Sequence, residues 1–144
     1  MRRNTEVKKL KRVGRTIRID LPELLLLEVE AKIDTGAYSS SIHISRVEEV
    51  FVENSKILKA YIYENSHFSS NHQSFEFKDF TLKNVKSSNG IIEKRYVVKT
   101  LVKLKGKRIR TQFTLTDRSD MKYPILLGRK FLSKRFLVDV SKGI

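Results

Sequence analysis

The chain has 144 residues, enough for one domain that buries about 68–70% of its unfolded surface. It has no cysteine, which excludes disulfides, thiolate metal sites and cysteine nucleophiles, and its leucine run at residues 24–27 is far shorter than the about 20 apolar residues of a membrane helix. Its 30 Lys and Arg residues outnumber its 16 Asp and Glu residues, for a net charge of +14, so attraction to polyanions is expected.

The N-terminal segment is strongly basic. We interpret residues 1–13 as a flexible basic arm in front of a folded domain at residues 14–144. The arm leads into no apolar stretch and no small-residue cleavage site, so we expect no secretory signal. The sequence therefore predicts a cytoplasmic protein that does not interact with a membrane.

Most of the chain alternates between apolar and polar side chains, the pattern of half-buried β-strands. The alternating segments are residues 16–21, 27–33, 57–63, 75–78, 80–85, 96–104, 108–115 and 136–140. Gly106 marks a hairpin turn, residues 65–74 form a polar loop, and residues 129–134 form a short helix. Many short strands with one helix predict an all-β barrel-like or sandwich fold.

One predicted strand runs directly into Asp34, Thr35 and Gly36. A carboxylate at such a junction can be held rigidly while it faces a cleft, and the glycine allows close approach of chain or substrate. About ninety residues later comes a hydrophobic trio closed by a glycine, 125–128. The two motifs together predict an aspartic-protease site, although Asp34 could instead cap a simple turn.

Basic residues also gather in a second group around Gly106. Its members are Lys103, Lys105, Lys107, Arg108 and Arg110. Lysine and arginine gain affinity for nucleic acids by releasing counterions from phosphate, so weak binding of nucleic acid or another polyanion is one interpretation. A merely soluble surface is the other, because the aromatic-rich signatures of RNA-binding domains are absent.

Several motifs in order resemble a known family. The Asp-Thr-Gly-Ala of residues 34–37, a glycine-containing hairpin at 87–92, the Lys-Gly-Lys hairpin at 105–107 and the Ile-Leu-Leu-Gly-Arg of 125–129 follow the element order of retropepsins. With the segments at 40–43, 95–98, 114–118 and 135–139, the chain more closely resembles the bacterial and archaeal retropepsin-like aspartic endopeptidases, also called ATP-dependent zinc proteases. The resemblance covers about residues 14–143 and implies a closed retropepsin-like barrel with one short C-terminal helix.

The resemblance also implies a role for each matching position. Asp34 would be the catalytic carboxylate, Thr35 would brace the active-site loop against its counterpart, and Gly36 and Ala37 would complete that loop. Asn89, Gly90 and Ile91 would form the tip of a flap over bound peptide. The supporting residues would be Leu126, Leu127 and Gly128, packed beside the Asp34 loop.

Aspartic proteolysis needs two carboxylates that share one proton. The sequence has no second Asp-Thr-Gly or Asp-Ser-Gly, so we expect a homodimer with two copies of Asp34 facing one another and a peptide or protein substrate. The alternative is a non-catalytic binding module for a peptide, a polyanion or a partner enzyme.

Despite the family label, we expect no metal and no cofactor. The three histidines, His43, His67 and His72, do not have the spacing of a zinc motif, and no glycine-rich phosphate loop is present. We expect His43 to be a partly buried structural residue, and Arg129 to pair structurally with an acid such as Asp117 or Asp139.

Overall fold

The computed structural model describes residues 10–62, 74–86, 89–116 and 122–143. Most of these residues belong to strands, as the alternation predicts. The strands are β1 (Lys11–Val13), β2 (Thr16–Leu21), β3 (Leu26–Ile33), β4 (Ser40–Val52), β5 (Ser55–Ile62), β6 (Ser74–Phe77), β7 (Phe80–Lys86), β8 (Ile92–Leu104), β9 (Lys107–Thr116), β10 (Ile125–Leu127) and β11 (Phe136–Val138). The helices are the 3-10 turn η1 (Pro22–Leu24) and α2 (Arg129–Leu132).

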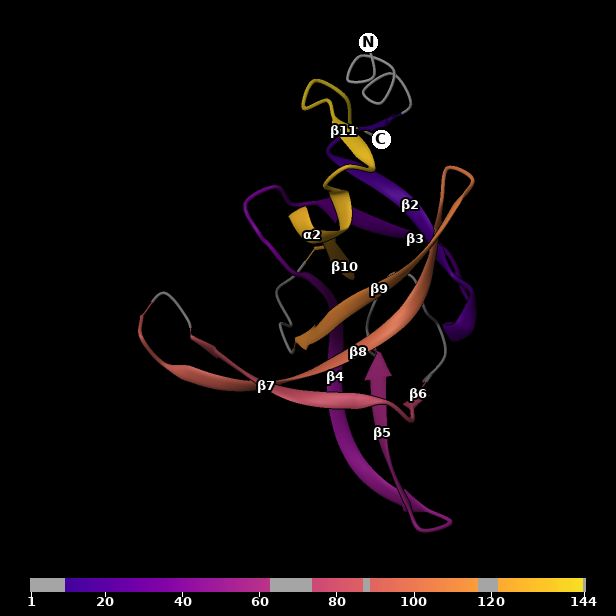
Figure 1. Cartoon of the computed structure of the whole chain (residues 1–144), viewed down its shortest axis with the longest axis vertical. Helices are drawn as coiled ribbons and strands as arrows, with labels where there is room; N and C mark the ends of the chain where they lie inside the picture. The colour runs from indigo at the N-terminus through magenta and orange to yellow at the C-terminus, as the bar shows by residue number, and fades with distance from the viewer. Residues whose placement is uncertain (1–9, 63–73, 87–88, 117–121, 144) are drawn as a thin grey trace.

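A ring of strands forms the body of the molecule (Figure 1). The strands follow one another in the order β10, β3, β2, β8, β9 and β4, and a second pairing of β10 with β4 closes the ring. The expectation of an all-β closed barrel with one short C-terminal helix is therefore confirmed. The helix is shorter than predicted, because it ends at Leu132.

The barrel is filled by the inward side chains of its strands. In β2, Ile19 and Leu21 are buried whereas Arg18 is exposed, and in β9 Ile109 and Phe113 are buried whereas Arg108 is exposed. Burying such a side chain stabilises the fold by about 1.5–3 kcal/mol. Since the side-chain period of a strand is two, this core fixes which residues reach the outer surface.

Two hairpins extend beyond the barrel. The outer parts of β4 and β5 pair with one another and form one projection, and β7 with the first half of β8 forms another (Figure 1). Among the described residues, β7 pairs with β8 alone. The second projection, which we call the β7–β8 arm, is the hairpin predicted around residues 87–92.

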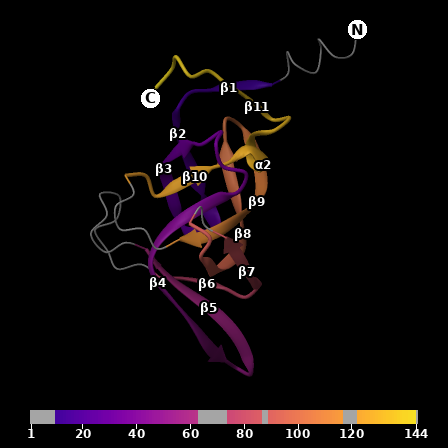
Figure 2. The same cartoon turned by 90° about the vertical axis from the view of Figure 1, so that its left-hand side faces the viewer.

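The terminal strands form a small separate sheet at one end of the molecule (Figure 2). Strand β1 runs parallel to β11, with Lys11 opposite Phe136 and Val13 opposite Val138. The last three residues of the expected arm at 1–13 therefore form a strand that pairs with β11. Strand β11 ends at Val138, two residues earlier than the alternation predicts.

Strand β4 was not predicted, although it has 13 residues. Its first residues pair with both β9 and β10, and from Ile44 it pairs with β5, with a register shift between Ile44 and Arg46. Neighbours on both sides bury the consecutive residues Ile42, His43 and Ile44, so no simple alternation is visible there. The predicted polar loop at 65–74 lies outside the described residues except for Ser74, which begins β6.

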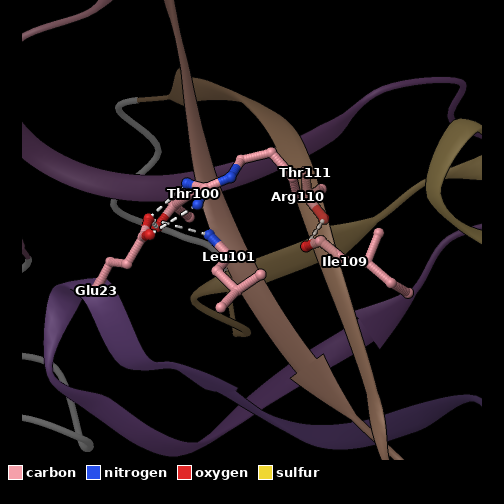
Figure 3. A network of polar contacts seen from close by, with 6 residues as sticks. All are labelled: Glu23, Thr100, Leu101, Ile109, Arg110 and Thr111. Carbon is pink, nitrogen blue, oxygen red and sulfur yellow. Dashed lines mark hydrogen bonds and ion pairs between the residues drawn. The ribbon is translucent and has the colours of Figure 1, made fainter.

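One polar network ties η1 to the barrel wall (Figure 3). The Glu23 carboxylate accepts bonds from Nη1 and Nη2 of Arg110 at 2.7 and 2.8 Å, and from the Thr100 hydroxyl at 3.3 Å. The bond from Arg110 lowers the pKa of Glu23 below its usual value. The network joins β8 and β9 to the turn between β2 and β3.

Within the described ranges, no helix is long and apolar enough to cross a membrane.

Candidate active site

Backbone bonds hold Asp34 at the end of β3. Its N–H donates to the carbonyl of Leu127 at 2.9 Å, and its own Oδ1 accepts from the N–H of Gly36 at 3.1 Å. The carbonyl of Asp34 accepts from the N–H of Ala37 at 3.2 Å, which completes a tight turn. The Asp34 side chain is half-buried, and the turn presents it at a surface opening. Asp34 therefore caps a turn, as the alternative interpretation of the sequence holds, and this turn lies beside a cleft.

Gly128 lets the loop and β10 approach one another closely. A Cβ atom at Gly128 would lie 2.6 Å from the carbonyl oxygen of Ser39, 2.7 Å from that of Tyr38 and 2.8 Å from that of Ala37. Its N–H donates to the hydroxyl of buried Ser40 at 3.1 Å. A side chain at this position would push the Asp34 loop away from the end of β10.

The start of α2 completes the support of the loop. The N–H groups of Arg129 and Lys130 donate to the carbonyls of Ala37 and Tyr38 at 2.8 and 3.0 Å. The Arg129 side chain donates from Nη1 to the carbonyl of Thr35 at 2.9 Å. Of the two acids expected to pair with Arg129, Asp139 accepts hydrogen bonds from Ser141, and Asp117 lies outside the described residues, so that pairing stays a prediction.

The Asp34 loop opens onto a cleft of about 450 Å³ between the barrel and the β7–β8 arm. The lining residues are Asp34, Ala37, Ser39, Ser41, Lys83, Asn84, Val85, Lys86, Arg95, Thr114, Thr116 and Leu126. Residues 83–86 of β7 are four consecutive residues among them. Since neighbouring side chains of a strand point to opposite faces, the backbone edge of β7 also faces the cleft.

The wall formed by the arm is basic. Lys83, Lys86 and Arg95 line it, and Asp34 is the only acidic side chain among the described residues of the lining. Lys83 lies directly opposite Arg95 in the β7–β8 register, a like-charged pair that destabilises a hairpin unless an anion lies nearby. Glu93 offsets part of the repulsion between these cations, since its carboxylate lies 3.4 Å from the Arg95 guanidinium. Glu93 does not line the cleft, however.

The structure brings together some of the predicted site residues and not others. Asp34, Ala37 and Leu126 share the cleft, and Leu127 and Gly128 contact the loop from β10. Thr35 and Gly36 are exposed beside it. Asn89, Gly90 and Ile91 bend the end of the arm, where Gly90 has a positive φ of 86° and the side chain of Asn89 accepts from the N–H of Ile91 at 3.3 Å, but they do not line the cleft.

Sequence reasoning did not identify the three basic residues of the cleft. A signal for two of them exists: a hairpin centred on Asn89 sets Lys83 opposite Arg95. That the paired cations would face Asp34 depends on how the arm bends, which the alternation does not encode.

No metal cluster accompanies the site. In the described part of the chain, no three His, Asp or Glu side chains gather as metal ligands would. His43 is buried in β4, close to the expected partly buried position, and His67 and His72 lie outside the described residues. The side chains around Asp34 therefore do not fit a zinc ion.

Comparison with known proteins gives three kinds of match. Residues 13–144 match the family model described as retropepsin-like aspartic endopeptidase RimB. The chain is 35% identical over 122 residues to a "probable alpha-L-glutamate ligase" of Shewanella halifaxensis and 29% identical over 119 residues to one of Parasynechococcus marenigrum, which covers 85% and 83% of this chain.

It spans only about a quarter of the length of these relatives, 27% and 26%. Among solved structures, the protein Lpg0085 of Legionella pneumophila, described as having unknown function, is similar with a TM-score of 0.74 and 27% identity over 93% of this chain and 96% of that one.

Proposed function

Since this chain belongs to the RimB-like family of retropepsin-like aspartic endopeptidases, we propose that it hydrolyses peptide bonds with two Asp34 carboxylates brought together in a homodimer. The observation that carries the proposal is the placement of Asp34. Backbone groups from β3, β10 and its own turn fix the side chain at the mouth of a cleft. A general acid–base group needs this kind of rigid support.

The chemistry requires one proton shared between two acids. The ionised carboxylate accepts a proton from water as the water oxygen attacks the peptide carbonyl carbon, and the protonated one donates to the carbonyl oxygen. Collapse of the tetrahedral intermediate breaks the C–N bond, and the nitrogen leaves with a proton from the pair. Two like charges about 3 Å apart cannot both ionise, which keeps that one proton in place.

A twofold axis is the simplest source of the second acid. In a C2 dimer the same patch of each subunit meets its copy. Around Asp34 this patch includes the exposed residues Thr35, Gly36 and Tyr38. Thr35 would then brace the loop of one subunit against that of the other.

The cleft favours substrates with acidic side chains. Lys83, Lys86 and Arg95 form a cationic wall, and the curated relatives carry a name that connects them with glutamate. A partly exposed ion pair contributes about 0.2–1 kcal/mol, so several in a row could raise kcat/KM for an acidic peptide about tenfold over its neutral equivalent. We propose glutamate-rich peptides as the substrate class.

The test uses the full chain and fluorogenic peptides made of glutamate or, as the matched neutral control, of glutamine. Asp34→Asn should abolish cleavage while circular dichroism and the dimer mass stay unchanged. The double variant Lys83→Gln/Arg95→Gln should remove the preference for glutamate. Cleavage by the Asp34→Asn variant at the wild-type rate would refute the catalytic assignment.

Mixing subunits tests the dimer separately. With a ninefold excess of Asp34→Asn subunits over a fixed amount of wild type, only about one tenth of the wild-type subunits would meet a wild-type partner, and activity should fall accordingly. Unchanged activity would mean that one subunit suffices. If no peptide is cleaved but acidic peptides bind the cleft in a salt-dependent way, the non-catalytic alternative is favoured.

A further inference from the structure

Three basic segments that are far apart in the sequence meet at the end of the molecule opposite the β4–β5 projection. The ammonium group of Lys11 in β1 donates to the carbonyl of Lys105 in the β8–β9 turn. The N–H of Arg15 donates to the carbonyl of Lys142 at 2.8 Å. Gly14 permits this contact, because a Cβ there would lie 2.5 Å from the same carbonyl oxygen. The two basic groups seen in the sequence therefore form one surface.

This surface contains a groove of about 610 Å³. Four exposed cations line it: Arg12, Arg18, Lys105 and Lys142. Its other described lining residues are apolar or small, and none of these is acidic or aromatic. The groove, which we call the basic groove, shares no lining residue with the Asp34 cleft.

Nearby carboxylates neutralise this surface only in part. Glu30 lies opposite Arg18 in the β2–β3 register, and Asp139 lies close enough to Arg12 and Lys142 for their charges to lower its pKa. However, hydrogen bonds from Ser141 are the main cause of that lowered pKa, and the Ser141 hydroxyl lies 2.6 Å from Asp139 Oδ1. The Asp139 carboxylate is thus already engaged by its own turn.

The positive charge continues along the adjoining hairpin. Lys103 and Arg108 lie directly opposite one another on β8 and β9, and both are exposed. Like charges in such a pair destabilise a sheet, and in the described strands only Asp20, opposite Lys103 on β2, is in register to offset them. A polyanion along this surface would remove the repulsion.

We propose that the basic groove binds the phosphodiester backbone of a nucleic acid. Each Lys or Arg that contacts a phosphate releases condensed counterions, and the arginine fork matches the phosphate oxygens. Without an aromatic side chain to stack on a base, the groove recognises the backbone and not the sequence. The protein thereby combines a peptide cleft with a separate anchor on nucleic acid.

The experiment measures fluorescence anisotropy of the full chain with labelled oligouridylate, oligodeoxythymidylate and duplex DNA of about 16 nucleotides over a range of salt. The test variant is Arg18→Gln/Lys105→Gln. The matched control, Lys94→Gln/Lys134→Gln, removes the same amount of charge from exposed positions outside the groove. The two double variants are also matched in backbone conformation, because each changes one lysine with a positive φ, Lys105 at 48° or Lys134 at 65°.

Loss of two phosphate contacts should lower the slope of log K against log salt by about 1.4 for a single strand, which is about 25-fold weaker binding at 0.1 M salt. The control double should bind within about twofold of the wild type, and Asp34→Asn should bind unchanged, which separates this inference from the proposed hydrolysis. An equal loss in both doubles, no binding of any oligonucleotide at low salt, or equal affinity for an acidic peptide of the same length in the groove would overturn the proposal.

Discussion

Gly128→Ala should destabilise the protein more than any other glycine-to-alanine change in the described part of the chain except Gly14→Ala. The added Cβ would meet three carbonyl oxygens at 2.6–2.8 Å, and all three belong to the backbone, so no side chain can rotate away. Relief requires residues 37–39 to move from α2. That movement breaks the bonds from the N–H groups of Arg129 and Lys130.

The magnitude follows from these contacts. Overpacking costs about 1–3 kcal/mol, and each of the two lost hydrogen bonds adds about 0.5–1.5 kcal/mol. The sum is about 2–6 kcal/mol of unfolding free energy, or about 6–20 °C in Tm for a chain of this size. Because the same movement displaces Asp34, peptide cleavage should fall further than the folded fraction does.

The assay is urea and thermal unfolding followed by circular dichroism. Gly143→Ala is the control, because its Cβ would meet only the movable end of the Arg15 side chain at 3.2 Å. We expect Gly143→Ala to unfold within about 1 °C of the wild type. If Gly128→Ala unfolds at the same temperature as this control, close packing does not position the loop.

Two further predictions concern single contacts. Glu23→Gln should lower the urea midpoint at neutral pH, and the difference from the wild type should shrink as the pH falls below 4.5, the ordinary pKa of glutamate. The reason is that a carboxylate whose pKa is lowered by folding stabilises the protein while it is ionised and loses that stabilisation when it is protonated. A difference that grows in acid would contradict the assigned ion pair with Arg110. Arg129→Lys should remove the hydrogen bond from the guanidinium group to the Thr35 carbonyl and leave the fold intact. We expect it to lower kcat about 10- to 100-fold with little change in KM. A change in KM alone would show that Arg129 acts on substrate binding instead.

Alternation predicted the fold well because the barrel buries one face of most strands. In β2 the period-two pattern of Ile17, Ile19 and Leu21 gives the same bounds as the structure, Thr16–Leu21. It failed at β4, where β9, β10 and β5 bury consecutive residues. It also missed β1, since three residues carry too little pattern and only pairing with β11 defines them.

The candidate site divides in the same way. Asp34 and Gly128 were visible in the sequence because the carboxylate closes its own turn and the close approach of the backbone at position 128 leaves no room for a side chain. Lys83, Lys86 and Arg95 were not, since lysine and arginine on a hairpin are typical of any exposed strand face. Their role depends on the cleft that they line, and that cleft depends on how the arm bends toward the Asp34 loop.

This division separates chemistry from substrate choice. The Asp34 loop is held by main-chain hydrogen bonds to β10 and α2, whereas the cations belong to β7 and β8 at the edge of the barrel. Within the described residues β7 pairs with β8 alone, so a substitution at Lys83 leaves the support of Asp34 unchanged. Under the proposed hydrolysis, charge on the arm would therefore change which peptide binds without altering the position of Asp34. The basic groove has no described lining residue in common with the cleft, so it can vary independently of both.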